Sequence, residues 1–169
     1  MVRNFHAGDR TRGGLQSIAV LIGFLALALG VGIFAALVTE PNVVSWYPTL
    51  AKPSFNPPNW VFAPVWTTLY VLMAIAGWRV WRITDFGATP MLYWVMQLAL
   101  NFAWSFIFFG AHQIFAALIE IAMLWIAVLV TTIAFFRVDR IAGALFVPYL
   151  LWVSFAAALN AAIYQLNPG

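Results

Sequence analysis

Aromatic and amide side chains recur at helical spacing within two long apolar segments of the sequence. The first segment carries a face at intervals of three or four residues: Trp94, Gln97, Asn101, Trp104 and Phe108. The second carries a face at intervals of four: Pro148, Trp152, Ala156 and Asn160. Amide groups are costly against lipid unless they find partners, so both faces should point into the protein. They predict either interhelical hydrogen bonding with packing, or the walls of a ligand cavity.

A third group of the same kind, Trp66, Thr67 and Tyr70, lies near the start of another apolar segment. A pocket with large flat aromatic walls and a few amide groups suits a planar, mostly apolar ligand. We therefore expect the chemistry of this chain to be binding at a shared internal pocket.

Ionisable residues give little sign of catalysis. Glu120 lies about two turns inside an apolar segment, and an intramembrane carboxylate is a functional candidate by default. Because no second acid or base accompanies it, a hydrogen-bonded or neutral structural carboxyl is favoured over a proton relay. His6 and His112 stand isolated, are expected to be solvated, and indicate no metal site. No catalytic triad or carboxylate pair is present, and the lack of Cys excludes thiolate chemistry.

The composition identifies the elements that must position these residues. Of 169 residues, 64% are hydrophobic and 8% are charged, whereas a soluble domain carries about 25% charged residues. The apolar runs are continuous, which favours helices over barrel strands. The sequence predicts an all-α integral membrane bundle of five helices, at 15–38, 60–82, 89 or 90 to 109, 113–136 and 140–164. They form a single domain over 15–169 after a polar tail over 1–14.

The connection over residues 39–59 is rich in proline and aromatic residues. Five prolines, Pro41, Pro48, Pro53, Pro57 and Pro58, argue against a continuous helix. Buried aromatic area orders a chain, and this connection contains Trp46, Tyr47 and Phe55. We expect a structured segment that covers the helix ends.

Basic residues predict the orientation. Seven of the eight fall on one side of a five-helix arrangement: Arg3, Arg10, Arg12, Arg79, Arg82, Arg137 and Arg140. Only Lys52 falls on the other. By the positive-inside rule, the amino terminus should be cytoplasmic and the carboxyl terminus should lie on the opposite side. These scattered charges do not suggest nucleic-acid binding.

The run from Trp46 to Phe62, WYPTLAKPSFNPPNWVF, continues through Pro64, Trp66 and Tyr70. It closely resembles the TspO/translocator protein family, the tryptophan-rich sensory proteins related to the peripheral benzodiazepine receptor. Residues 97–105, 147–152 and 159–160 agree with the same family, so the resemblance covers nearly all of the chain after residue 15.

The resemblance implies a five-helix bundle that binds porphyrins and other tetrapyrroles, sterols, and isoquinoline or benzodiazepine compounds. By matching motif, the pocket walls would include Tyr47, Trp66, Asn101, Trp152 and Asn160, and the helical face described above adds Trp104. No cofactor is required, because the tetrapyrrole is the ligand. Family members are commonly homodimers, here through Ala99 and Ala103 of the third helix. The bacterial cell membrane is the expected location.

A membrane receptor or regulator of tetrapyrroles is thus the leading functional hypothesis. One alternative is light-dependent porphyrin degradation, reported for some bacterial members, in which Trp66 and Trp152 would be the catalytic residues. Another is transport, although the lack of an inverted repeat argues against alternating access. Cholesterol is a weaker expectation, because no basic residue follows Tyr164 as the vertebrate cholesterol pattern requires.

Overall fold

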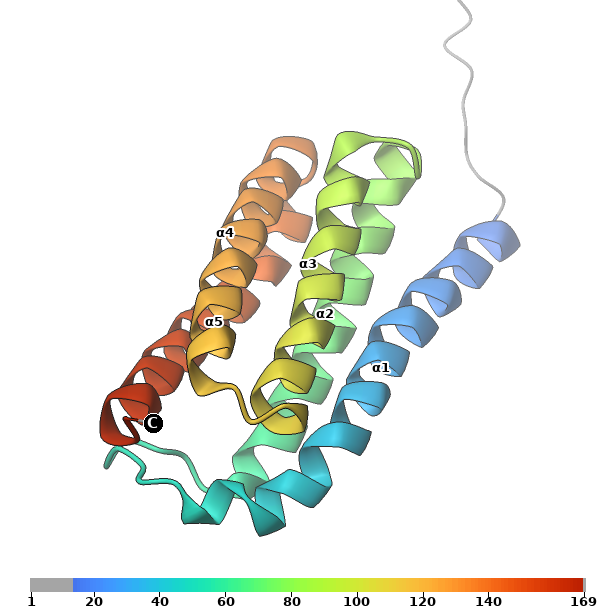
Figure 1. The fold of residues 1–169 in the computed structure, drawn as a ribbon. Helices are drawn as coiled ribbons and strands as arrows, with labels where there is room; N and C mark the ends of the chain where they lie inside the picture. The colour runs from blue at the N-terminus through green and yellow to red at the C-terminus, as the bar shows by residue number, and fades with distance from the viewer. Residues whose placement is uncertain (1–13, 169) are drawn as a thin grey trace, which may run out of the picture.

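The computed structural model describes residues 14–168, and these fold into five long helices with no strand among them (Figure 1). The helices are α1 (Gly14–Ser45), α2 (Phe62–Ile83), α3 (Thr89–Ser105), α4 (Ile114–Val138) and α5 (Arg140–Leu166). Each lies in a segment long and apolar enough to cross a membrane. The predicted all-α five-helix membrane bundle is therefore confirmed. The predicted tail, with His6 and its three arginines, falls outside the described residues except for Gly14.

The helices form a closed ring. Helix α1 packs on α2, α2 on α5, α5 on α4, α4 on α3, and α3 returns to α1. The α2–α3 and α4–α5 connections lie at the end where α1 begins, while the α1–α2 and α3–α4 connections lie at the other end with the carboxyl end (Figure 1). Successive connections therefore lie at opposite ends of the bundle, as the predicted orientation requires. Which end is cytoplasmic stays a prediction.

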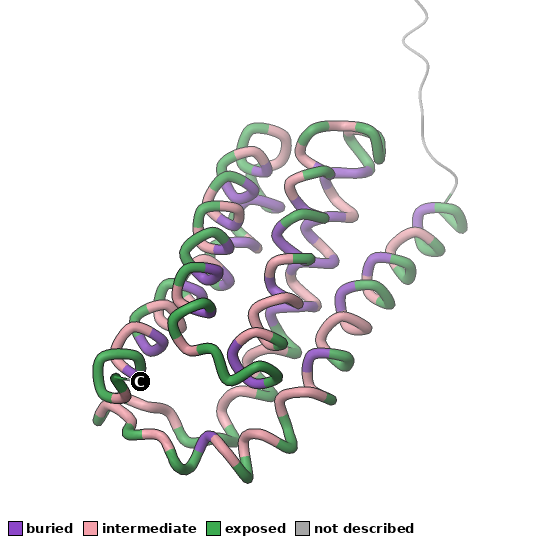
Figure 2. The backbone as a smooth tube through the Cα atoms, viewed as in Figure 1, coloured by how far each residue is buried: buried purple, intermediate pink, exposed green. Residues whose placement is uncertain are grey.

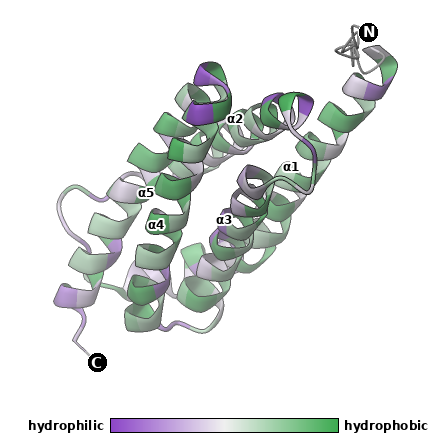
Figure 3. Ribbon diagram, turned by 90° about the horizontal axis from the view of Figure 1, so that it is seen from above, coloured by the Kyte–Doolittle hydropathy of each residue, from purple (hydrophilic) through white to green (hydrophobic). Residues whose placement is uncertain are grey.

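Exposed side chains on the helices are largely apolar. Buried residues follow the inner sides of the helices in Figure 2, and Figure 3 shows that most of the residues along the helices are hydrophobic. Ile22, Phe34 and Leu151, for example, are 59%, 62% and 65% exposed. Because a soluble protein rarely exposes apolar area on this scale, these side chains match a lipid surrounding.

Helix α1 is longer than the sequence predicts. It continues to Ser45 with Pro41 inside it, so the predicted end at residue 38 was wrong. Polar side chains of this last stretch bond back to carbonyls one turn earlier: Thr39 Oγ1 to Ala35 at 2.9 Å, Asn42 Nδ2 to Val38 at 2.8 Å, and Ser45 Oγ to Pro41 at 2.6 Å. These bonds keep the three polar side chains satisfied on the helix itself, where lipid supplies no hydrogen bonds. The other predicted ends lie within about two residues of the observed ones, if the helical turn Phe106–Gly110 that follows α3 is counted with it.

Residues 46–61, here called the cap, cover one end of the bundle. The cap begins and ends in 3-10 turns, Tyr47–Thr49 and Asn59–Val61. Lys52 Nζ donates to the carbonyls of Tyr47 at 2.9 Å and Leu50 at 2.8 Å. Asn167, beyond α5, makes two hydrogen bonds of 2.9 Å with Ala51: its Oδ1 accepts from the N–H of Ala51, and its Nδ2 donates to the carbonyl of Ala51. The expectation of a structured segment over the helix ends is met for this part of the connection.

A π-helical turn, Phe106–Gly110, extends α3, where the sequence predicts regular helix. The N–H of Ala111 donates to the carbonyl of Phe106, five residues earlier, at 2.8 Å. This wider turn accompanies the burial of two consecutive rings, since Phe108 and Phe109 are only 2% and 8% exposed. Both rings consequently reach the interior.

Asp139 joins three helices at the opposite end. It is the only residue between α4 and α5, and its Oδ1 caps α5 by accepting from the N–H of Ile141 at 2.9 Å. Its Oδ2 accepts from Arg79 Nε of α2 at 2.7 Å. The hydrogen bond from Arg79 is the main reason that the pKa of Asp139 lies below its ordinary value. Arg79, which in the sequence served only to predict orientation, thus also links α2 to the α4–α5 connection.

Candidate ligand cavity

A cavity of about 880 Å³ lies beneath the cap and is bounded by all five helices. It falls within the size range of small-molecule sites, about 300–1,000 Å³. The structure places every residue of the predicted ligand site on its walls: Tyr47, Trp66, Asn101, Trp104, Trp152 and Asn160. These come from the cap, α2, α3 and α5. Whether they bind a ligand stays a prediction.

Flat aromatic rings make up much of the cavity wall. Trp66 of α2 stacks on Tyr70 with centroids 5.6 Å apart and meets Trp152 of α5 edge-on, at 6.4 Å and 88°. On the α3 side, Trp104 stacks on Phe108 at 5.0 Å. Rings at such distances and angles attract one another and hold their positions. The cavity therefore offers preformed flat surfaces.

The two asparagines connect helices as well as lining the cavity. The Tyr70 hydroxyl donates to Asn101 Oδ1 at 2.6 Å. Trp104 Nε1 donates to Asn160 Oδ1 at 3.1 Å, and Asn160 Nδ2 donates to the carbonyl of Ile114 at 3.1 Å. Both alternatives raised by the sequence thus apply to these residues, because they bond between helices and also face the cavity. Each carbonyl oxygen has a second lone pair with which to accept from a ligand.

The tryptophans differ in how they are held. Trp78, Trp94, Trp104 and Trp125 each donate an indole N–H to a protein acceptor. Within residues 14–168, Trp66 and Trp152 have no such hydrogen bond and are held through ring contacts. Their indole N–H groups are therefore not committed to an acceptor in this part of the chain.

Tyr47 closes the cavity on the cap side. Its hydroxyl donates to Asn56 Oδ1 at 2.6 Å, and Lys52 Nζ lies 5.1 Å from its ring centroid. Burial raises the pKa of Tyr47 to about 12, because the phenolate would lose its hydration. Tyr47 is therefore a neutral hydrogen-bond donor and a cap-side aromatic surface at physiological pH.

Some residues of the two helical faces predicted from spacing do not line the cavity. Trp94 and Gln97 are buried in the core rather than on the cavity wall. Trp94 Nε1 donates to the carbonyl of Met73 at 3.0 Å, and Gln97 Nε2 to that of Trp94 at 2.8 Å. Pro148 lines an outer groove between α2 and α5. Only the parts of the two faces that lie nearer the cap, with Asn101, Trp104, Trp152 and Asn160, fit the prediction of cavity walls.

The sequence reasoning missed the wall formed by α1. Gly32, Ala36 and Val43 line the cavity, and a Cβ on Gly32 would lie only 2.5 Å from Cε2 of Tyr70. The small residues at four-residue spacing, Ala28, Gly32 and Ala36, were the available signal. They permit the close approach of a ring from α2.

Glu120 lies inside α4 as the sequence predicts, but the hydrogen-bonded alternative for its carboxyl is wrong among the residues that the structure describes. Glu120 is 4% exposed, does not line the cavity, and neither carboxylate oxygen has a partner within residues 14–168. His112 is exposed but not isolated, which corrects the expectation: Nε2 lies 2.8 Å from Asn42 Oδ1, and its ring stacks on Trp46 at 4.1 Å. In the described part of the chain, no three His, Cys, Asp or Glu side chains are grouped as a metal site would need.

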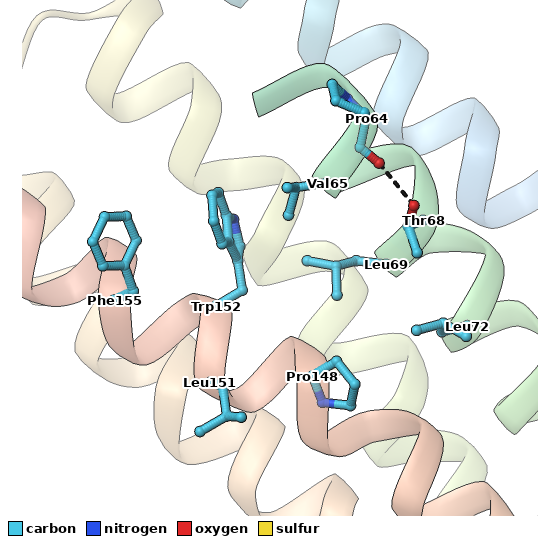
Figure 4. Close-up of a pocket in the computed structure, with 9 residues that line it drawn as sticks. All are labelled: Pro64, Val65, Thr68, Leu69, Leu72, Pro148, Leu151, Trp152 and Phe155. Carbon is cyan, nitrogen blue, oxygen red and sulfur yellow. Dashed lines mark hydrogen bonds between the residues drawn. The ribbon is translucent and has the colours of Figure 1, made fainter. Parts of the chain in front are cut away.

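A second hollow, the outer groove, runs between α2 and α5 on the outside of the bundle. Its volume is about 570 Å³. Figure 4 shows the side chains that line it, from α2 and α5: Pro64, Val65, Thr68, Leu69, Leu72, Pro148, Leu151, Trp152 and Phe155. Trp152 and Phe155 also line the cavity, so the two spaces share part of one wall.

Comparisons with known proteins agree with this architecture. The model of the TspO/MBR family matches residues 24–166. The tryptophan-rich protein TspO of Chlorobaculum tepidum is 45% identical, over 91% of this chain and 98% of its own length. The tryptophan-rich sensory protein of Cereibacter sphaeroides is 40% identical, over 88% and 92%. The human translocator protein is 41% identical, over 73% and 76%. The chain is an integral membrane protein and belongs to the TspO/MBR family.

Proposed function

We propose that this protein is a membrane receptor that binds a planar tetrapyrrole of the porphyrin class in the cavity beneath the cap. Membership of the TspO/MBR family supports a membrane receptor or sensor role. The observation that carries the choice of ligand is the aromatic lining, to which Trp66 and Trp152 contribute two indole rings nearly at right angles to each other. Flat apolar walls with a few polar groups favour a flat, mostly apolar ligand.

The polar groups of the cavity complement such a ligand. Pyrrole N–H groups can donate to the free lone pairs on Oδ1 of Asn101 and Asn160. Acidic substituents can accept from the indole N–H groups of Trp66 and Trp152. The Tyr47 hydroxyl lies at the cap side of the same space.

Protoporphyrin IX titrated into the purified protein should quench tryptophan fluorescence saturably. The double variant Trp66→Ala/Trp152→Ala should lose this binding. In Trp66→Phe/Trp152→Phe, affinity should fall by about tenfold, since the rings remain but two hydrogen bonds of about 0.5–1.5 kcal/mol each are lost.

Trp125→Phe is the matched control, because Trp125 belongs to α4, bonds to Ser154, and lies outside the cavity. It should bind as the parent protein does. Circular dichroism should show full helicity for all variants. Equal affinity of the parent protein and the Trp66→Ala/Trp152→Ala variant would refute the proposed site.

We further propose a bacterial cell membrane location, with the amino-terminal end of the bundle in the cytoplasm. Arg82, Arg137 and Arg140 lie at that end, and Lys52 lies in the cap. The chain has no Cys, so Gln165→Cys and Asp85→Cys each give one reactive thiol. In intact cells, a membrane-impermeant maleimide should label the first variant and spare the second. The reverse pattern would refute the orientation.

A homodimer through α3 also remains a proposal. Ala99 is exposed and Ala103 half-buried on this helix, so small residues are accessible to a second copy. Ala99→Leu/Ala103→Leu should lower the protein mass measured by light scattering in detergent from dimer to monomer. Val130→Leu, on α4, should leave the mass unchanged. A parent protein that is monomeric, or a double variant that remains dimeric, would contradict the proposed interface.

A further inference from the structure

The cavity and the outer groove meet at Trp152 and Phe155. Both side chains line both spaces, so they form part of the wall between them. The groove lies between two membrane-spanning helices and includes Leu151, which is 65% exposed. The groove therefore opens toward the hydrocarbon of the bilayer, while the cavity lies beneath the cap on the other side of Trp152 and Phe155.

The groove presents an apolar path. Pro148 of α5 and Pro64 near the start of α2 contribute compact apolar rings to its lining (Figure 4). The hydroxyl of Thr68 is already committed to the carbonyl of Pro64, at 2.8 Å. An apolar molecule in the groove would therefore leave this hydroxyl satisfied.

Trp152 is held in a way that permits movement. Its ring contacts are with Phe62 at 6.0 Å, Trp66 at 6.4 Å and Phe155 at 5.5 Å, and its indole N–H has no acceptor in the described chain. A change of its rotamer would break no hydrogen bond. Opening the cap, in contrast, would break the paired hydrogen bonds between Ala51 and Asn167.

We propose that Trp152 gates a lateral entrance between α2 and α5, through which the planar apolar ligand passes from the bilayer into the cavity. This inference rests on the proposed function, since it takes a membrane-soluble ligand as the occupant. It adds the route by which that ligand arrives. A ligand that partitions into lipid then reaches its site without crossing the aqueous side of the cap.

The absence of Cys allows the groove to be blocked at a single position. Leu151→Cys places a thiol in the groove but outside the cavity, and benzyl methanethiosulfonate adds a bulky apolar group by forming a mixed disulfide. Ile126→Cys, 57% exposed on α4, carries the same group away from the groove as the control. Each labelled protein is placed in lipid nanodiscs, and quenching by protoporphyrin IX is followed by stopped flow.

Labelled Leu151→Cys should show association and dissociation rates at least about tenfold slower than labelled Ile126→Cys, with Kd within about twofold. A blocked route slows both directions equally and leaves the equilibrium unchanged. Reduction of the mixed disulfide should restore the rates, which excludes misfolding as the cause. Equal rates for the two labelled proteins would overturn the lateral entrance while leaving the binding site intact. Absence of saturable quenching in the unlabelled parent would instead overturn the proposed function.

Discussion

The hydroxyl of Tyr70 donates a 2.6 Å hydrogen bond to Oδ1 of Asn101, joining α2 to α3 at the cavity. Both residues are nearly inaccessible, with exposures of 5% and 4%. The ring of Tyr70 reaches this position because α1 presents Gly32 against it. The geometry of the cavity therefore depends on a residue without a side chain on a third helix.

Gly32→Ala should weaken ligand binding. The added Cβ would lie 2.5 Å from Cε2 of Tyr70, so the ring must move and its bond to Asn101 must lengthen or break. Loss of a buried hydrogen bond of about 1 kcal/mol corresponds to about fivefold in Kd. Fluorescence titration with protoporphyrin IX measures the change. Gly30→Ala is the matched control, because a Cβ there meets nothing within 4 Å; equal affinities for the two variants would refute this account.

Gly77→Ala should lower stability without changing the affinity of the folded protein. A Cβ on Gly77 would lie 2.9 Å from both Phe24 Cε1 and Trp94 Nε1, which are buried and not at the cavity. Overpacking of this kind costs about 1–3 kcal/mol. Thermal unfolding in detergent should show a lower Tm than for Gly23→Ala, where the space is open. An unchanged Tm would contradict the packing at Gly77.

Asp139 should stabilise the bundle in two separable ways. Asp139→Ala removes the cap of α5 and the bond from Arg79, whereas Asp139→Asn keeps a capping oxygen and loses the charge. We expect Asp139→Ala to be the less stable variant, by about 1 kcal/mol, because it loses the hydrogen bond from the N–H of Ile141 at the start of α5. Chemical unfolding of both variants in detergent measures the difference. Equal stabilities would show that the hydrogen bond between Asp139 and the N–H of Ile141 does not stabilise the protein.

The charge of Asp139 also predicts a pH dependence. Because its pKa is lowered in the folded protein, its contribution is fully present above the ordinary value of 3.8 and is lost as pH falls through the lowered value. The Tm difference between the parent protein and Asp139→Asn should therefore favour the parent at neutral pH and shrink under acid conditions. A difference independent of pH would contradict a role for the charge.

Asn167→Ala should loosen the cap. The change removes two hydrogen bonds to Ala51, so amide exchange over residues 46–61 should accelerate by about tenfold, for a combined loss of about 1–2 kcal/mol. Hydrogen–deuterium exchange with mass spectrometry measures this. Gln165→Ala alters an exposed neighbouring residue and should have no effect on the cap. Exchange that is equally fast in both variants would refute the tether.

Hydrophobic runs were sufficient to predict the five helices and their order. Each run is long enough to span a bilayer, and lipid requires the backbone to satisfy its own hydrogen bonds, which leaves few alternatives. The continuation of α1 past Pro41 could not be predicted, because a proline usually ends a helix. Thr39, Asn42 and Ser45 each bond back to a carbonyl one turn earlier in this stretch, so their polar groups are satisfied within the helix.

The site was predictable where function and packing require the same residue types. Spacing placed Asn101 with Trp104 on one face and Trp152 with Asn160 on another, and the aromatic group near the start of the second helix supplied Trp66. The family motif added Tyr47. Spacing alone could not divide the face between cavity and core, since Trp94 and Gln97 share its periodicity but lie toward the other end of α3. Nor could it show that the glycine of α1 is paired with Tyr70, a contact between residues far apart in sequence.

The π-helical turn at Phe106–Gly110 makes the cavity sensitive to the number of residues in the chain as well as to their types. The π-helical turn places five residues where a regular turn would place about four, so deleting one residue would leave a regular turn with one side chain fewer on the wall. Phe108 and Phe109 could then no longer both keep their places on it. A deletion would thus alter the wall even where every aromatic side chain is retained.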